Sequence, residues 1–156
     1  MKDTFKKILV GVDGSPPSAR AVQVASSMAL KMAAEMMIVH VVIRVGTTNG
    51  AGTDSRARLQ ASARRRGQDL LRRARDSCDP TTVVGESLRE GIAADEILTC
   101  AETWGAQLII VGAHGQSRLG RLILGSTADA VARGAHCPVV TVSNHVDALQ
   151  VTVSPE

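Results

Sequence analysis

Five short segments dominated by apolar residues alternate along the chain with longer segments in which apolar residues recur every three or four positions. Continuous apolar runs are typical of strands buried on both faces of a sheet, and the longer segments are typical of amphipathic helices. The expected strands cover 7–13, 36–43, 81–88, 107–113 and 137–143. The expected helices cover 16–32, 56–76, 91–106 and a segment that begins near 126.

This alternation predicts an α/β fold of three layers, in which helices cover both faces of a parallel sheet. Ligands of such sheets bind beyond the carboxyl ends of the strands, where the strand order reverses. The first and fourth strands are the natural neighbours of that position, and their ends carry Asp13 and Gly112. We therefore expect a binding crevice next to these two residues.

Capping signals agree with these boundaries. Ser15 can cap the first helix, and Pro16 can occupy its first helical position. Gly105 can end the third helix. Residues 44–55 are rich in Gly, Thr, Asn and Ser, which predicts a surface loop between the second strand and the second helix.

Composition narrows the class of protein. The 156 residues are enough for one well-buried core, and 44% of them are apolar. Aromatic residues make up only 1%, which excludes a stacking platform for single-stranded nucleic acid. The three cysteines form no CxxC pair, so a disulfide framework or zinc site is not expected and a cytoplasmic location fits best. No apolar segment approaches the length of a membrane span, and a net charge of +3 favours anionic ligands only weakly.

The strongest chemical signal is the stretch VGAHGQSRLGRLILGST, between the fourth strand and the last helix. Gly112 and Gly115 follow the strand, and Gly125 precedes Ser126 and Thr127 at the start of the helix. Glycine lets the backbone approach a phosphate chain, and the free N–H groups and dipole of a helix N-terminus favour an anion. Each residue alone could serve only a turn, a cap or packing, but together they predict a phosphate site.

The spacing Gly-x2-Gly-x9-Gly-Ser, with KILVGVDGS near the start, HVV in the second strand and CPVVTV near the end, resembles the universal stress protein family in its ATP-binding branch. The resemblance implies a five-stranded parallel sheet ordered 3-2-1-4-5 in one domain over 1–145. It also implies a nucleotide-dependent regulatory or stress-response protein that binds ATP, with Mg²⁺. Asp13 and Val41 would contact adenine or ribose. The full set of implied nucleotide contacts is Gly11, Asp13, Val41, Gly112, His114, Gly115, Gly125, Ser126 and Thr127.

The same resemblance implies a homodimer formed through the last strand, at Val139, Val140, Thr141 and Val142. Residues 146–156 run beyond the usual end of the family. Apolar residues alternate in this tail, which predicts a strand that joins an edge of the sheet or crosses to a partner, or else a disordered segment.

Two further features have plainer interpretations. His40 lies inside an apolar strand, and we expect a core histidine whose hydrogen bonds are satisfied. Eight arginines between 56 and 75 could bind nucleic acid. No reading element or stacking residue accompanies them, so a solvated outer helix face is the preferred interpretation.

Three other functions make different demands on the same residues. A slow ATPase stays open as the alternative, although the chain has no GxxxxGK[ST] motif and no evident group to orient a water molecule. A phospho-acceptor receiver domain would need an acidic cluster around Asp13, which is flanked by Val12 and Gly14. A dinucleotide-binding domain would need GxGxxG after the first strand, where the chain reads GVDGSPPS.

Overall fold

The structure is a computed structural model that describes residues 5–44, 46, 52–113, 124–144 and 149–152. Strands and helices alternate through most of this length, as the apolar pattern predicts. In chain order the elements are β1 (Lys7–Gly11), α1 (Pro16–Met32), β2 (Glu35–Val42), α2 (Thr53–Asp76), β3 (Val84–Glu90), α3 (Ala93–Trp104), β4 (Leu108–Gly112), α4 (Ser126–Gly134), β5 (Val139–Val142) and β6 (Leu149–Thr152).

The strands form one sheet in the order β3-β2-β1-β4-β5-β6. The first five are parallel, so the predicted order 3-2-1-4-5 is confirmed. β6 pairs antiparallel with β5, in a register that sets Val139 opposite Thr152 and Val142 opposite Leu149. The strand order reverses between β1 and β4, which is where a ligand site is expected.

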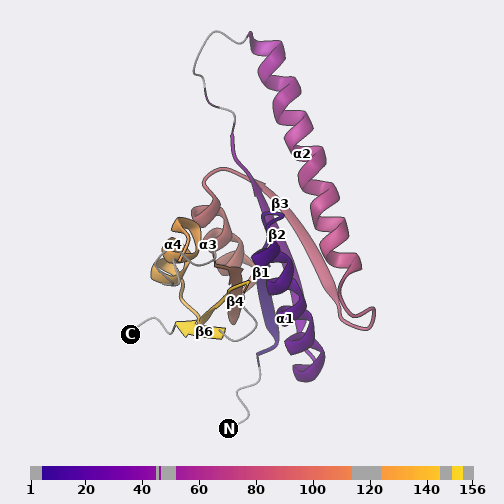
Figure 1. The fold of residues 1–156 in the computed structure, drawn as a ribbon, viewed down its shortest axis with the longest axis vertical. Helices are drawn as coiled ribbons and strands as arrows, with labels where there is room; N and C mark the ends of the chain where they lie inside the picture. Colours follow the sequence, from indigo (N-terminus) through magenta and orange to yellow (C-terminus); the bar gives the residue numbers. More distant parts are fainter. Residues whose placement is uncertain (1–4, 45, 47–51, 114–123, 145–148, 153–156) are drawn as a thin grey trace.

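Helices α1 and α2 cover one face of the sheet, and α3 and α4 cover the other (Figure 1). Because successive side chains of a strand point to opposite faces, β1 serves both layers. Ile8 and Val10 pack in the cluster with α1 and α2, whereas Leu9 packs in the cluster with α3 and α4, and all three are fully buried. This double burial explains why the strands read as unbroken apolar runs.

The predicted helix ends are confirmed where capping residues define them. The Ser15 side chain accepts a hydrogen bond from the Ser18 N–H, at 3.4 Å, and prolines occupy the first two positions of α1. Gly105 ends α3 in the left-handed conformation, with φ at 75°. These signals are local, so they can be recognised without tertiary information.

The two largest differences from the predicted boundaries are at the starts of α2 and β3. Helix α2 begins at Thr53, with Gly52 as its cap, and not at 56. β3 begins at Val84 and not at 81, because a turn holds the preceding residues. In that turn the Thr81 N–H donates to Asp79 Oδ1 at 2.8 Å, and the Thr82 N–H donates to the Asp79 carbonyl at 3.0 Å. The hydrogen bonds from the Thr81 hydroxyl and N–H also lower the pKa of the Asp79 carboxyl.

The cysteines are free. Burial raises the pKa of the Cys78 and Cys137 thiols, so both are protonated at neutral pH. In the described part of the chain, no helix has both the length and the apolar character needed to cross a membrane.

Candidate functional site

A cavity of about 100 Å³ lies at the carboxyl ends of β1, β2 and β4. The N-terminal ends of α3 and α4 form its other wall. The residues that line it are Gly11, Val12, Asp13, Ser18, Val39, His40, Val41, Ala93, Ile97, Val111, Gly112, Gly125, Thr127 and Ala128. Its position next to β1 and β4 agrees with the crevice expected where the strand order reverses.

The N-terminus of α4 opens on this cavity. Gly125 is the buried N-cap, and together with Thr127 and Ala128 it lines the cavity wall. No side chain among the described residues caps the helix. The N–H groups of a first helical turn have no intrahelical partner, and the helix dipole adds partial positive charge there. This end of the cavity therefore favours an anion.

Asp13 lies at the head of β1, where hydrogen bonds tie it to the start of α1. Its Oδ1 accepts the Ser15 N–H at 2.9 Å, and its own N–H donates to Ser18 Oγ at 3.3 Å. The Ser18 hydroxyl in turn donates to the Ser15 carbonyl at 3.0 Å. The Asp13 carboxylate is thus positioned by the same cap that begins α1, at the edge of the cavity.

His40 donates from Nδ1 to the Val12 carbonyl over 2.7 Å, because a carbonyl oxygen can only accept. The side chain is half-buried, so the expectation of a satisfied histidine agrees with this contact. The ring also lines the cavity, a role that the apolar context of its strand did not indicate. The hydrogen bond fixes the ring orientation in the wall.

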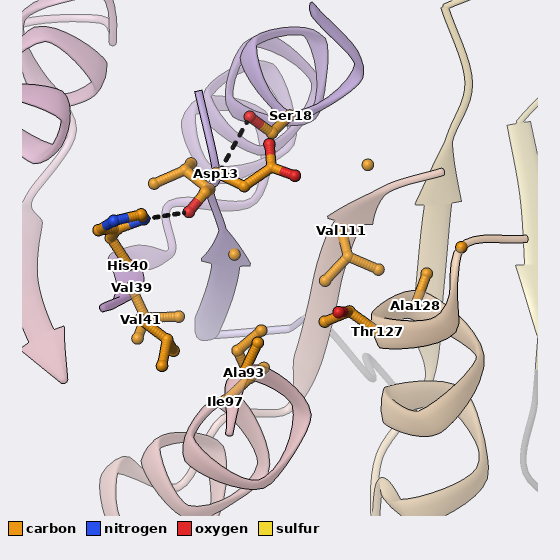
Figure 2. Close-up of a pocket in the computed structure, with 14 residues that line it drawn as sticks. Asp13, Ser18, Val39, His40, Val41, Ala93, Ile97, Val111, Thr127 and Ala128 are labelled. Carbon is orange, nitrogen blue, oxygen red and sulfur yellow. Dashed lines mark hydrogen bonds between the residues drawn. The ribbon is translucent and has the colours of Figure 1, made fainter. Parts of the chain in front are cut away.

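The remaining wall is apolar. Figure 2 shows Val39 and Val41 of β2 on one side of the cavity, Ala93 and Ile97 of α3 below them, and Thr127 on the opposite side. Val39 and Ile97 are buried, at 1% and 6% exposure. The cavity thus combines an apolar half with an anion-favouring half at the α4 N-terminus, an arrangement suited to a ligand with an apolar ring at one end and negative charge at the other.

The structure brings together most of the predicted site residues. Gly11, Asp13, Val41, Gly112, Gly125 and Thr127 line the cavity. Ser126 begins α4 but is exposed and is not among the lining residues. His114 and Gly115 lie outside the described residues.

Gly112 is required for a reason that the sequence did not indicate. A Cβ at this position would lie 2.7 Å from both the Pro17 carbonyl carbon and the Ser18 nitrogen. These are backbone atoms of the first turn of α1, which cannot move aside as a side chain can. The close approach of α1 to β4 therefore demands glycine here, independently of any ligand in the cavity.

Gly11 is also packed closely, since its Cβ would lie 3.2 Å from Ile97 Cδ1 and 3.3 Å from Val111 Cγ1. Gly125 differs from both. Its φ of −61° and ψ of 156° are open to any residue, so the backbone conformation does not demand glycine. Like Gly11 and Gly112, Gly125 lines the cavity.

Several lining residues were missed by sequence reasoning, among them Ser18, Ala93 and Ile97. Ser18 and Ala93 belong to the first turns of helices that follow strands, and Ile97 lies one turn further along α3. A general rule could have found them, because in a parallel sheet the residues after each strand gather at one edge. Which of these positions face the cavity depends on how each helix packs, and the spacing alone does not carry that information.

A metal ion has few protein ligands here. Asp13 supplies the one carboxylate among the lining residues. No group of three or more His, Cys, Asp or Glu side chains that could hold a metal occurs within the described ranges. A divalent cation at this site would therefore take most of its ligands from a bound phosphate group and from water.

Comparison with known proteins agrees with this architecture. The Universal stress protein family matches residues 4–143. A universal stress protein of Methanocaldococcus jannaschii is 31% identical over 142 residues, which is 90% of this chain and 84% of that protein. The universal stress protein A homolog 2 of Coxiella burnetii is 34% identical over 146 residues, 90% of this chain and 96% of its own length.

Solved structures share the fold. The universal stress protein UspA of Lactobacillus plantarum has a TM-score of 0.76 at 23% identity, over 90% of this chain and 99% of that one. A family member from Arabidopsis thaliana with AMP bound has a TM-score of 0.66 at 18% identity, and the match covers 91% of this chain and 94% of that one. A universal stress protein in complex with cAMP has a TM-score of 0.59 at 24% identity, and the match covers 92% of this chain and 100% of that one. With a family match over most of its length and two relatives above 30% identity, this chain belongs to the universal stress protein family.

Proposed function

We propose that this protein binds an adenine nucleotide, ATP together with Mg²⁺, in the cavity between β1, β4 and the N-terminus of α4, and that the bound state regulates its action in a stress response. The observation that carries the proposal is the N-terminus of α4, which no described side chain caps and where buried Gly125 faces a cavity with an apolar far wall. The solved relatives with AMP and with cAMP support the nucleotide class.

The residues present fit such a ligand. Val41 and Ile97 offer apolar contact for the base, and the Asp13 carboxylate can accept hydrogen bonds from ribose hydroxyls. The N–H groups of the first turn of α4 favour the phosphates. The cavity of about 100 Å³ is smaller than the roughly 300–1,000 Å³ of pockets that enclose a whole small molecule, so part of the nucleotide would lie at its mouth.

Mg²⁺ would be bound mainly by the phosphates, because Asp13 is the one carboxylate among the described residues that line the cavity. The ion would neutralise phosphate charge. The protein itself would orient the nucleotide and hold it against the apolar wall. A cytoplasmic location suits this role and the free cysteines.

Replacing Gly125 in the cavity wall by valine tests the proposed nucleotide site. Gly125→Val keeps an accessible backbone conformation but fills the space at the α4 N-terminus, so we expect ATP affinity to fall at least about tenfold in titration calorimetry with Mg²⁺. Gly52→Val is a matched control. Gly52 is also a helix N-cap, with φ −57° and ψ 157°, and a Cβ there meets nothing within 4 Å.

The control variant should bind ATP as the unchanged protein does. Parallel titrations with AMP and cAMP identify the preferred nucleotide. Equal ATP affinity in the Gly125→Val variant and the Gly52→Val variant would contradict the proposed site, and no binding of any of the three nucleotides by the unchanged protein would contradict the proposed function.

We also propose a homodimer formed through β5, which requires that the edge of β5 be free to pair with a second copy. β5 pairs with β4 on one side and with β6 on the other. A second copy can therefore pair with the backbone of β5 only after β6 leaves that edge.

A further inference from the structure

A second and larger cavity lies between α1 and α2. These two helices cover the face of the sheet opposite to α3 and α4 (Figure 1). Its volume is about 480 Å³, which falls within the range of pockets that take small molecules. The residues that line it are Val12, Gly14, Ser18, Ala19, Arg20, Val22, Gln23, Leu70, Arg73, Ala74, Ser77 and Asn144. We call it the α1–α2 groove.

The floor of the groove is apolar. Val12 and Val22 are buried, at 6% and 1% exposure, and Leu70 and Ala74 of α2 form the facing wall. Gly14 stands at one end with φ at 84°, a conformation that disfavours other residues, and a Cβ there would contact Leu70 at 3.8 Å. The absence of a side chain at position 14 keeps that end of the groove open.

The two helices are tied together beside the groove. Gln23 Nε2 of α1 donates to the Ser77 hydroxyl oxygen just after α2, at 3.2 Å. The same group approaches the Ser77 carbonyl at 3.4 Å. These contacts fix the separation of the walls, so the groove is a preformed feature of the packing of α1 against α2.

Arginine is the only charged residue type among the described residues that line the groove. Arg20 lies on α1 and Arg73 on α2, and none of these described lining residues is Asp or Glu. Other arginines of α2 have acidic partners, such as Arg75 with Glu86 at 2.8 Å and Arg72 with Asp69 at 3.2 Å. No carboxylate in the described part of the chain forms an ion pair with Arg73, which is exposed. An apolar trough flanked by guanidinium groups is complementary to a molecule with an apolar chain and an anionic head.

We propose that the α1–α2 groove is a second ligand site, which binds a small amphipathic anion such as a medium-chain carboxylate. The apolar chain lies along Val12, Val22 and Leu70, and the head group pairs with the exposed Arg73. The groove shares Val12 and Ser18 with the nucleotide cavity, yet it opens on the other face of the sheet. Ligand binding in the α1–α2 groove can therefore be tested separately from nucleotide binding in the first cavity.

The experiment uses decanoate as the probe and calorimetric titration of the full chain without nucleotide. Decanol, which has the same chain without the charge, tests the role of the head group. Arg73→Ala should weaken decanoate binding about tenfold, because a charge-assisted hydrogen bond is lost. Arg65→Ala is the matched control, since Arg65 is an exposed arginine of the same helix that does not line the groove.

A second variant addresses the apolar floor. Leu70→Asp places a carboxylate in the groove and should abolish decanoate binding, and the circular dichroism spectrum of the variant shows whether it folds. Arg73→Lys keeps the charge and should restore part of the affinity lost in Arg73→Ala. Binding of decanoate but not decanol, weakened by Arg73→Ala and not by Arg65→Ala, supports the proposal.

Equal affinity for decanoate and decanol would overturn it, as would equal affinity of the Arg73→Ala and Arg65→Ala variants. Failure of decanoate to bind below its critical micelle concentration would also overturn it. If a second copy of this chain occupies the groove instead, light scattering will show a concentration-dependent mass that Leu70→Asp abolishes, with no decanoate binding, and this too counts against the proposal.

Discussion

Glycines of one sequence signature serve different physical purposes in this protein. The sequence predicts that Gly112 and Gly125 both let the backbone approach a phosphate chain, and both residues line the cavity. The structure shows that Gly112 is demanded by the backbone of α1, whose atoms would lie 2.7 Å from a Cβ. Gly125 has an ordinary backbone conformation, so its lack of a side chain matters only for the space next to it. The two glycines of the motif thus lie at one cavity, and the packing of α1 explains why one of them is glycine.

This difference predicts the stability of a variant. Gly112→Ala should lower the free energy of unfolding by about 3 kcal/mol, because the added methyl meets backbone atoms that cannot rotate away. Urea unfolding followed by circular dichroism measures the change. Gly52→Ala, where the methyl meets nothing within 4 Å, should change stability by no more than about 0.5 kcal/mol. Equal stability of the two variants would show that α1 does not pack so closely on β4.

Helix α2 depends on one glycine for its contact with the sheet. Gly67 is buried in the middle of the helix, where a Cβ would lie 2.7 Å from Leu88 Cδ1 and 2.8 Å from His40 Cδ2. The sequence places Gly67 on the apolar stripe of the helix, but from the sequence alone a glycine at such a position indicates only a less stable helix. Its purpose becomes clear once α2 lies across β2 and β3, because the absent side chain lets the helix approach the sheet.

Two effects compete when Gly67 is replaced by alanine. Alanine favours the helix by about 1 kcal/mol over glycine, whereas overpacking a core contact costs about 1–3 kcal/mol. The end of Leu88 can rotate, but His40 is held by its 2.7 Å hydrogen bond to the Val12 carbonyl, so we expect the packing cost to win. Gly67→Ala should therefore be less stable by about 1 kcal/mol in urea unfolding. A gain in stability of similar size would mean that α2 lies farther from β2.

At the scale of the whole molecule, the sheet has a sixth strand that changes its edge. β6 lies antiparallel to β5, so the backbone of Val139–Val142 is paired on both sides within one chain. Exposed strand edges are templates for pairing with another chain, and covering an edge suppresses such pairing. The alternating apolar residues of the tail were compatible with this strand, but they did not specify which edge it would join.

Removal of β6 should therefore change the association of the protein. A chain that ends at residue 144 exposes the edge of β5, and we expect it to dimerise more strongly than the full chain in sedimentation velocity measurements at matched concentrations. A chain that ends at residue 152 retains β6 and serves as the control, with the association behaviour of the full chain. The β5 edge is not the dimer interface if the chains that end at 144 and at 152 associate equally.

Local patterns in the sequence determined the order of strands and helices, the burial of the strands on both faces, the caps at Ser15 and Gly105, and the edge of the sheet where the cavity lies. These features follow from periodicity and from conformational preferences of single residues, which act within a few positions. The tertiary structure alone decided that α1 packs on Gly112, that His40 and Ile97 share a cavity wall, that α1 and α2 enclose a groove, and that β6 joins β5. The first three contacts join residues far apart in the chain, whereas β5 and β6 are close in sequence. All of them depend on how closely the packed elements approach one another.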